Sequence, residues 1–291
     1  MSPPRQHALE WRRPIAGATR HGAVWRWTWT GTVVMGIINV TPDSFSDGGT
    51  TLVPEQAVAA ARAAWRAGAA VLDVGGASTR PGAEAVPAAV ELERVIGVVR
   101  ALRAAGPDAR LSIDPSSVEV AAAALALGVD LVNDVRGLRD PAMRALVAEA
   151  GVPAVIMHMR GEPRTMQDDP RYDDVVREVG AWLRDAGEAA DAAGVPSVIL
   201  DPGFGFGKRT EHNRALLLAT GALAALGRPV MVGASRKGTL GEVTGERLAA
   251  KRDPASLAAH LEAARLGAAM VRAHDVAAHV QGLAVRSGLD G

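Results

Sequence analysis

The chain has no cysteine in its 291 residues, and this absence excludes several kinds of chemistry. Without thiols there can be no disulfide bond, no thiolate metal site and no cysteine nucleophile. The lack of cysteine is also compatible with a cytoplasmic protein, and a cytoplasmic location is what we expect.

Neither sign of charge is in excess, since 32 basic residues balance 32 acidic ones. A balanced chain gives no reason to expect a nucleic acid or an anionic membrane as a partner. If the protein binds a phosphate group, it must do so through a local arrangement of side chains.

Long hydrophobic runs are missing as well. The longest apolar stretch, residues 120–132, contains Gly128 and Asp130 and is too short to span a membrane. Residues 1–30 contain five arginines and no uninterrupted apolar core, so they do not resemble a signal peptide. With 48% hydrophobic residues the chain can nevertheless bury a large core.

Eight short apolar runs are present instead, and each of them stops at a residue able to do polar chemistry. Continuous β-branched runs are typical of buried parallel strands. A polar residue at the carboxyl end of each such strand, repeated eight times, is what a (β/α)₈ barrel presents to its substrate. The residues at these ends are Asn39, Asp73, Asp114, Asn133, His158, Asp201, Ser235, and Arg272 with His274.

Alanine-rich segments with helical character lie between the apolar runs, and several of them end at a glycine. Alternation of strand and helix along the whole chain predicts a parallel sheet. An open, doubly wound sheet is the alternative, but eight units in one chain favour closure. We therefore predict an α/β fold, a TIM barrel formed as one domain by residues 32–291, and a separate extension formed by residues 1–31.

The extension contains three tryptophans, Trp25, Trp27 and Trp29, that alternate with polar residues and are followed by Gly31. This period of two predicts a β-hairpin with the three indole rings on one face. We expect the hairpin to close the amino-terminal end of the barrel. The competing interpretation is an exposed aromatic binding surface.

The first two loops after strands are enlarged and contain glycine and proline. They comprise residues 41–50 and residues 78–85. Long loops at the carboxyl ends of barrel strands commonly act as lids.

The most specific sequence stretch is NVTPDSFSDGG, residues 39–49, directly after the first strand. It is followed in order by GGASTRPGA (75–83), SIDP (112–115), NDVRG (133–137), DPGFGFGK (201–208), GASRKG (233–238) and VRAHD (271–275). With these seven motifs the chain resembles the dihydropteroate synthase family over about residues 32–285. Single motif matches are weak, but seven in the same order at strand ends are specific.

The resemblance implies a transferase of folate biosynthesis that acts on an alkyl group and is the target of sulfonamide drugs. In this reaction 6-hydroxymethyl-7,8-dihydropterin diphosphate and 4-aminobenzoate give 7,8-dihydropteroate and diphosphate by a dissociative substitution. The resemblance also implies Mg²⁺ as cofactor and a homodimer formed through outer helices.

The family pattern assigns roles to individual residues of this chain. It implies that the pterin is bound by Asp114, Asn133, Asp201, Phe206, Lys237 and Arg272, and that Lys237, Arg272, His274 and Asp47 are catalytic. Diphosphate is expected at Asn39, Arg80, Arg272 and His274, with Asn39 also the Mg²⁺ ligand. The residues expected around 4-aminobenzoate are Thr79, Pro81, Phe45, Phe206, Gly238 and Thr239. Asp73 and His158 are expected only to support the site.

The chain departs from the family pattern at three positions. Ala77 stands where a glutamate is usual, Pro115 where a threonine is usual, and Gly238 where a larger or polar residue is frequent. None of them removes a group to which we assign a role in the reaction, so activity is expected. Two alternatives remain: a pterin-binding methyltransferase, and a catalytically silent paralogue that serves as a binding protein.

Overall fold

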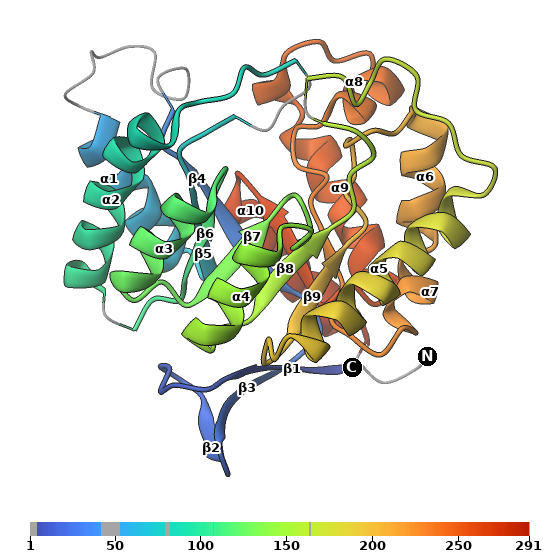
Figure 1. Ribbon diagram of the computed structural model, residues 1–291. Helices are drawn as coiled ribbons and strands as arrows, with labels where there is room; N and C mark the ends of the chain where they lie inside the picture. The colour runs from blue at the N-terminus through green and yellow to red at the C-terminus, as the bar shows by residue number, and fades with distance from the viewer. Residues whose placement is uncertain (1–4, 42–52, 79–81, 107, 163, 291) are drawn as a thin grey trace.

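A computed structural model describes residues 5–41, 53–78, 82–106, 108–162 and 164–290. Eight parallel strands form the centre of the molecule and helices surround them (Figure 1). Their order is β10-β11-β4-β5-β6-β7-β8-β9. In chain order the strands are β4 (Val33–Asn39), β5 (Val71–Gly75), β6 (Leu111–Asp114), β7 (Leu131–Asp134), β8 (Ala154–Met157), β9 (Val198–Asp201), β10 (Met231–Val232) and β11 (Met270–Ala273).

The barrel closes between β9 and β10 through a single pairing. Leu200 forms an isolated parallel bridge with Val230, and its N–H donates to the carbonyl of Pro229 over 2.9 Å. The predicted (β/α)₈ barrel is therefore confirmed, with β10 as its shortest strand and the β9–β10 contact as its seam.

The helices follow the predicted alternation. They are α1 (Val53–Arg66), α2 (Ala88–Ala105), α3 (Val118–Ala126), α4 (Pro141–Ala150), α5 (Val175–Ala192), α6 (Thr210–Leu218), α7 (Thr220–Ala224), α8 (Gly238–Thr244), α9 (Asp253–Arg265) and α10 (Val276–Asp290), with a short 3₁₀ helix at Ala249–Lys251. The segment 211–226, which we predicted as one helix, is divided at Ala219 into α6 and α7.

Local sequence explains where individual helices begin and end. Asp140 precedes α4 and its carboxylate accepts the N–H of Ala142, which satisfies one of the donors left unpaired at a helix start. Gly151 ends the same helix with a φ of 64°, a left-handed conformation that glycine adopts without strain.

Within the described residues, no helix has both the length and the apolar character needed to cross a membrane.

All residues of β6, β7, β8 and β9 are buried, including the polar residues at their carboxyl ends. The strands are covered by helices on the outside and by one another's side chains on the inside, which explains their continuous apolar sequences. The polar strand ends are the exception in this core.

The amino-terminal residues form a separate antiparallel sheet below the barrel, at the end opposite to α8 (Figure 1). The expected hairpin consists of β2 (Thr19–His21) and β3 (Val24–Thr30), and β1 (Gln6–Trp11) adds a third strand on the other side of β3. Trp27 and Trp29 are buried and stacked, with ring centroids 4.3 Å apart.

The burial of Trp27 and Trp29 favours a hairpin that closes the amino-terminal end of the barrel over an exposed aromatic binding surface. The indole N–H of Trp29 donates to the carbonyl of Ala269 over 3.0 Å, just before β11 begins. The division of the chain at residue 31 into an extension and one barrel domain stays a prediction.

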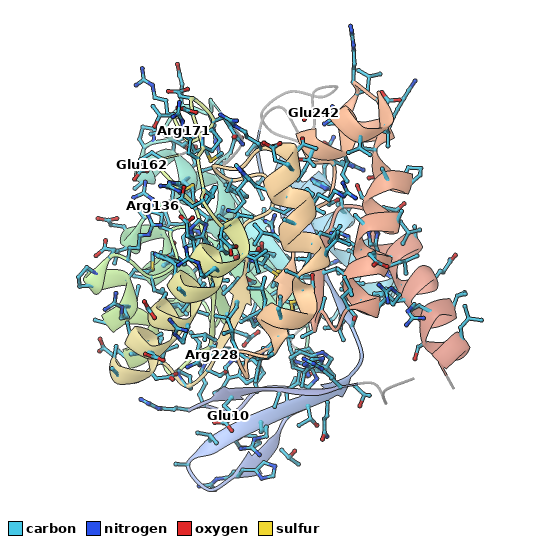
Figure 2. All side chains as sticks on the ribbon, turned by 90° about the vertical axis from the view of Figure 1, so that its right-hand side faces the viewer. Glu10, Arg136, Glu162, Arg171, Arg228 and Glu242 are labelled. Atoms are coloured by element: carbon cyan, nitrogen blue, oxygen red, sulfur yellow. The ribbon has the colours of Figure 1, made fainter. Side chains whose placement is uncertain are left out.

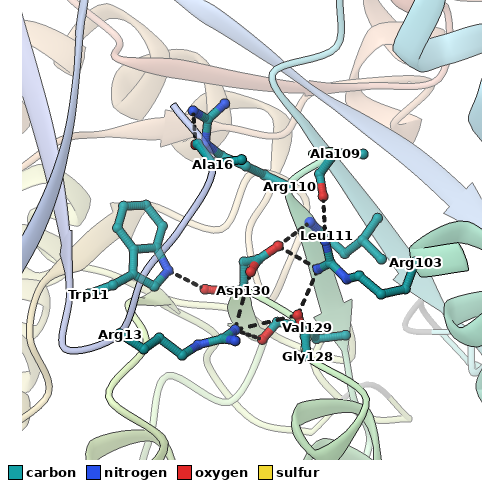
Figure 3. A network of polar contacts seen from close by, with 10 residues as sticks. All are labelled: Trp11, Arg13, Ala16, Arg103, Ala109, Arg110, Leu111, Gly128, Val129 and Asp130. Atoms are coloured by element: carbon teal, nitrogen blue, oxygen red, sulfur yellow. Dashed lines mark hydrogen bonds and ion pairs between the residues drawn. The ribbon is translucent and has the colours of Figure 1, made fainter. Parts of the chain in front are cut away.

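A polar network at the start of β6 and β7 fixes the small sheet to the barrel (Figure 3). The indole N–H of Trp11 donates to the backbone carbonyl of Asp130 over 2.6 Å. The carboxylate of Asp130 accepts from Arg13 at 3.2 Å, from Arg103 at 2.6 Å and from the N–H of Leu111 at 3.0 Å. One aspartate thus joins the extension, a helix and two strands.

Replacing Trp11 with phenylalanine is expected to lower the free energy of unfolding by about 2 kcal/mol. The variant keeps most of the buried ring but leaves the carbonyl of Asp130 without its donor, and an unsatisfied buried group costs about 1–3 kcal/mol. Chemical denaturation followed by circular dichroism measures the change. Trp65, which is 38% exposed on α1, provides the control, since Trp65→Phe is expected to change stability by less than about 0.5 kcal/mol. Equal losses in the two variants would contradict this role of Trp11.

Candidate active site

Polar side chains are concentrated at the carboxyl ends of the barrel strands. Figure 2 shows this end at the top, where Glu242 lies, while Glu10 of the small sheet lies at the opposite end. Four polar residues lie at or near the carboxyl ends of four strands, and each of them is at most 7% exposed. They are Asp73 of β5, Asp114 of β6, Asn133 of β7 and Asp201 of β9. Such burial of charged groups requires partners within the barrel.

Arg272 of β11 connects two of these carboxylates. Its Nε donates to Asp73 Oδ2 over 2.7 Å and its Nη2 donates to Asp114 Oδ2 over 3.0 Å. Asn133 Nδ2 donates to the same oxygen of Asp73 over 2.8 Å. Four strands therefore contribute to one hydrogen-bonded cluster, and Asp73 is at its centre.

Several acceptors of this cluster are not used by the protein. Asp73 Oδ1, Asp114 Oδ1 and the hydroxyl of Ser112 are buried, and none of them has a hydrogen-bond partner among the described residues. Buried polar atoms are nearly always paired, and leaving one unpaired costs about 1–3 kcal/mol. Unpaired acceptors at the end of a barrel are suited to a ligand that offers several N–H donors.

Burial also changes the acidity of the carboxyl groups. It raises the pKa of Asp114 to about 7, because the charge of Arg272 offsets the burial only in part and Asp73 adds further repulsion. Burial likewise raises the pKa of Asp201, against the opposing effects of the Gly203 N–H, which donates to Asp201 Oδ1 over 2.7 Å, and of nearby Lys237.

Lys237 lies at the residue before α8 and faces an aromatic ring. Its Nζ is 3.9 Å from the centroid of Phe206, a cation–π contact. Gly205 has a φ of 84°, and a Cβ at this position would be 3.2 Å from Lys237 Cδ. A glycine at position 205 therefore allows the close approach of the lysine.

Ser235 joins the ends of β10 and β11. Its hydroxyl is 2.9 Å from His274 Nδ1 and accepts the backbone N–H of His274 over 3.1 Å. His274 therefore has a fixed backbone and a hydrogen-bonded ring. Arg272, two residues earlier, is directed to the carboxylates instead.

A cavity of about 500 Å³ opens beside Lys237. Thr239 in its wall accepts a hydrogen bond from Asn213 Nδ2 over 2.7 Å, and the hydroxyl of Thr210 donates to Glu242, another lining residue. The lining residues are Gln167, Asp168, Pro170, Gly205, Lys208, Arg209, Thr210, Glu211, Lys237, Gly238, Thr239 and Glu242.

Lys208 is a buried residue to which sequence reasoning gave no role. Its ammonium donates to the carbonyls of Phe206 and His158, at 2.9 and 3.2 Å, and lies 3.1 Å from His158 Nδ1. Burial lowers the pKa of Lys208 to about 7 and, more strongly, lowers that of His158. A neutral His158 can accept from Lys208, so the pair joins the loops after β8 and β9.

The structure brings most of the predicted pterin residues together. Asp114, Arg272 and Asn133 share the cluster around Asp73, while Asp201 adjoins it and Lys237 contacts Phe206. Asn39 is half-buried at the end of β4, in register with Gly75. Phe45, Asp47, Thr79, Arg80 and Pro81 lie outside the described residues. The roles assigned to all of these residues stay predictions.

A buried glutamate contacts the neighbours of two positions at which the chain departs from the family pattern, Ala77 and Pro115. Glu91 of α2 accepts from both the N–H and the hydroxyl of Ser116, the residue after Pro115. A Cβ on Gly76, the residue before Ala77, would lie 2.9 Å from Glu91 Cγ. Glu91 thus packs against Gly76 and binds Ser116 with its carboxylate, so it links the two segments that contain these departures.

Comparisons with known proteins agree with this geometry. The family described as "Pterin binding enzyme" matches residues 35–274. Dihydropteroate synthase of Escherichia coli K12 is 43% identical over 258 residues, which is 87% of this chain and 89% of that protein.

Solved structures are equally similar. The dihydropteroate synthase of Xanthomonas albilineans with 4-aminobenzoic acid has a TM-score of 0.85 and 47% identity, over 91% of this chain and 96% of that one. The enzyme of Thermus thermophilus in complex with 6HMPPP has a TM-score of 0.82 and 41% identity, over 97% of this chain and 100% of that one.

Proposed function

The chain belongs to the pterin binding enzyme family, and we propose that it is a dihydropteroate synthase. The reaction joins 6-hydroxymethyl-7,8-dihydropterin diphosphate to 4-aminobenzoate and gives 7,8-dihydropteroate and diphosphate. The bond between the pterin methylene carbon and the diphosphate oxygen breaks, and the amine nitrogen takes its place and loses a proton. The protein is thus a transferase of an alkyl group.

The observation that carries this proposal is the cluster around Asp73. Arg272 and Asn133 occupy one carboxylate oxygen of Asp73, and Arg272 occupies one of Asp114, while the other oxygens and the Ser112 hydroxyl have no partner among the described residues. The amino-pyrimidine edge of a pterin offers adjacent N–H groups that match such acceptors. Asp201, at the end of β9, offers a further carboxylate to the amino-pyrimidine edge of the pterin.

The same carboxylates support a dissociative reaction. When diphosphate leaves, positive charge develops on the methylene carbon and spreads into the pterin ring. Buried acceptors that are fixed in advance stabilise such charge better than water does, because they need no reorganisation during the reaction. We assign this role to Asp114 and Asp201, with Arg272 holding Asp114 in place.

The departing diphosphate requires cationic and neutral donors. We assign it to His274, which Ser235 orients, and to Arg272, whose guanidinium has further N–H groups beyond those directed at Asp73 and Asp114. Arg80, outside the described residues, completes this set in the proposal.

Asn39 suits a Mg²⁺ site in which the substrate supplies most of the ligands. An amide oxygen is a hard donor, and the described residues contain no cluster of three or more histidine, cysteine, aspartate or glutamate residues that could hold a metal by themselves. Mg²⁺ bound between Asn39 and the diphosphate would neutralise charge on the leaving group.

We place 4-aminobenzoate beside Lys237, between the pterin and the 500 Å³ cavity. Phe206 forms a wall for the aromatic ring, while Gly238 and Thr239 lie where the carboxylate would point. Phe45, Asp47, Thr79 and Pro81 belong to the same proposal, with Asp47 in the loop that closes over the reacting groups.

The decisive experiment combines the purified protein with both substrates and Mg²⁺ and measures dihydropteroate and diphosphate in equal amounts. Omission of 4-aminobenzoate or of Mg²⁺ serves as the control. Absence of product at saturating substrate, with the pterin still bound, would favour a binding protein instead. Methyl transfer to or from a pterin without this condensation would indicate a methyltransferase.

Pterin binding is expected to depend on pH through Asp114. Its pKa is raised to about 7 in the free protein, and N–H donors of the ligand favour the ionised carboxylate. Binding therefore releases a proton below pH 7, and the affinity for 6-hydroxymethylpterin should fall by up to about tenfold per pH unit as the pH decreases to 5.5. Calorimetry in buffers of different ionisation enthalpy measures the released proton.

Asp114→Asn provides the matched variant for this measurement. It should release about one proton fewer than the wild type at pH 6, because residue 114 then has no group to ionise. The same proton release in both proteins would assign the pH dependence to another group, such as Asp201.

Two further elements complete the proposal. We infer a homodimer formed through outer helices, which the sedimentation velocity of the purified protein tests directly. Leu218, Val285 and Leu289 are exposed apolar residues on α6 and α10 that such a contact would cover.

We also infer a cytoplasmic location, because a pterin diphosphate is a charged metabolite that does not diffuse across membranes.

A further inference from the structure

Two buried histidines lie outside the proposed site. His260 of α9 and His279 of α10 are 0% and 1% exposed, and His260 Nδ1 lies 2.8 Å from His279 Nε2. Neither belongs to a motif that identified the family. We refer to this pair as the histidine relay.

The backbone around the relay fixes where its protons lie. The N–H of Ala234 donates to His260 Nε2 over 2.9 Å, so this nitrogen carries no proton. His260 must then donate from Nδ1 to His279 Nε2, and His279 in turn donates from Nδ1 to the carbonyl of Asp275 over 2.6 Å. Both rings are therefore neutral, and all three hydrogen bonds donate in the same direction, from the N–H of Ala234 to the carbonyl of Asp275. Burial lowers the pKa of His260 to about 3, in keeping with a neutral ring.

The relay ends at two backbone groups that flank residues of the site. Ala234 directly precedes Ser235, and Asp275 directly follows His274. Because Ser235 and His274 are themselves hydrogen-bonded, the contacts form a closed ring that joins the ends of β10 and β11.

The turn that begins at Ala234 is strained. The N–H of Lys237 donates to the carbonyl of Ala234 over 3.2 Å, and Arg236 between them has a φ of 59°. This conformation normally requires glycine, and a residue with a Cβ is strained there. The turn therefore needs support from its surroundings.

Helix α9 supplies that support. The N–H of Arg236 donates to Ser256 Oγ over 2.9 Å, and its guanidinium forms two hydrogen bonds of 2.7 Å with Asp253. His260, on the next turn of the same helix, holds the first residue of the strained turn. The position of Lys237 thus depends on α9.

We propose that His260 and His279 are positioning residues of the reaction, which hold the turn carrying Lys237 against the strand end carrying His274. The proposal rests on the function given above, in which the amine nucleophile lies beside Lys237 and the leaving diphosphate beside His274. Both substrates can still bind when the relay is broken, but the two reacting groups are then less well aligned. The relay therefore acts mainly on kcat.

Two variants of His260 test this role. His260→Leu fills a similar volume without polar atoms, and it is expected to lower kcat at least tenfold while KM for both substrates changes less than threefold. His260→Gln can still accept the N–H of Ala234 and donate to His279, so it should keep kcat within threefold of the wild type. His21→Leu, at an exposed position of β2, is the control. A wild-type kcat in His260→Leu, or equal losses in the Leu and Gln variants, would overturn the proposal.

A measurement without substrate separates this proposal from the proposed function. In ¹⁵N-histidine NMR of the wild-type protein, His260 and His279 are both expected as neutral Nδ1–H tautomers. Amide exchange at Ala234 and Arg236 should be at least tenfold faster in His260→Leu, with exchange in β6 unchanged. These results can be obtained even if the protein forms no dihydropteroate. An Nε2–H tautomer of His260, or unchanged exchange at Ala234, would refute the relay.

Discussion

Replacement of Arg272 by methionine is expected to lower the free energy of unfolding by about 3 kcal/mol and kcat/KM at least tenfold. Methionine keeps the volume of the side-chain stem but removes the only cation that bonds to both Asp73 and Asp114 in the described structure. Breaking a buried ion pair by removing one partner costs about 3–5 kcal/mol, because a buried charge is left uncompensated. A tenfold loss of kcat/KM corresponds to about 1.4 kcal/mol of transition-state stabilisation.

The stability loss should depend on pH. Without Arg272, the folded-state pKa of Asp114 lies further above its unfolded value, because the positive charge that offsets its burial is lost, so Asp114 favours the protonated form. The folded variant is then relatively more stable at low pH, and its difference from the wild type should narrow as the pH falls from 8 to 5. Urea denaturation at several pH values measures this difference.

Arg26→Met is a matched control for Arg272→Met. Arg26 pairs with Glu10 on the small sheet, where its side chain is 42% exposed, and an exposed pair contributes at most about 1 kcal/mol. The double variant Arg272→Met/Asp114→Asn should recover part of the lost stability but none of the activity. Equal stability losses in the Arg26 and Arg272 variants would contradict the buried cluster as the cause.

Replacement of Lys237 by methionine is expected to lower kcat/KM at least tenfold but, unlike Arg272→Met, to leave the free energy of unfolding nearly unchanged. Lys237 is only half-buried, and its cation–π contact with Phe206 contributes on the order of 0.5–1 kcal/mol. Its charge lies beside the buried carboxylate of Asp201, where the proposal places the boundary between pterin and 4-aminobenzoate. Steady-state kinetics and thermal denaturation of the same preparation separate the two effects.

Lys251→Met, at an exposed lysine of the short 3₁₀ helix, controls for the loss of a positive charge. Lys237→Arg keeps the charge but changes the shape of the donor, so it should retain activity between the wild type and Lys237→Met. Wild-type kcat/KM in Lys237→Met would remove the lysine from the reaction and leave it as a wall of the cavity.

The barrel could be predicted from the sequence because its signal is local and repeated. The apolar run 198–200, for example, is completely buried and is followed directly by the buried Asp201. The burial of Trp27 and Trp29 could also be predicted, since a period of two places alternate residues on one face. The third strand of the small sheet was missed because β1 has a weaker alternation, with Leu9 and Trp11 buried among polar residues.

The interior contacts could not be predicted in the same way. Asp73 carried the same strand-end signal as Asp114, but its central role comes from Arg272, which lies 199 residues away in sequence. His260 belongs to no motif, and Lys208 lies at the end of the motif DPGFGFGK without any sign that its side chain is buried. Their importance depends on carbonyl and N–H groups of distant loops, and no spacing in the sequence indicates which backbone groups will meet them.

The small sheet at the bottom of the barrel has a consequence for synthesis on the ribosome. Trp29 donates its hydrogen bond to Ala269, 240 residues later, and the first barrel strand pairs with the last. At about 5–20 residues per second, the partner of Trp29 is made roughly 12–50 s after the tryptophan itself. The small sheet therefore leaves the ribosome before the barrel strands but docks only after β11 is made, and its indole rings remain accessible to chaperones while the barrel is being translated.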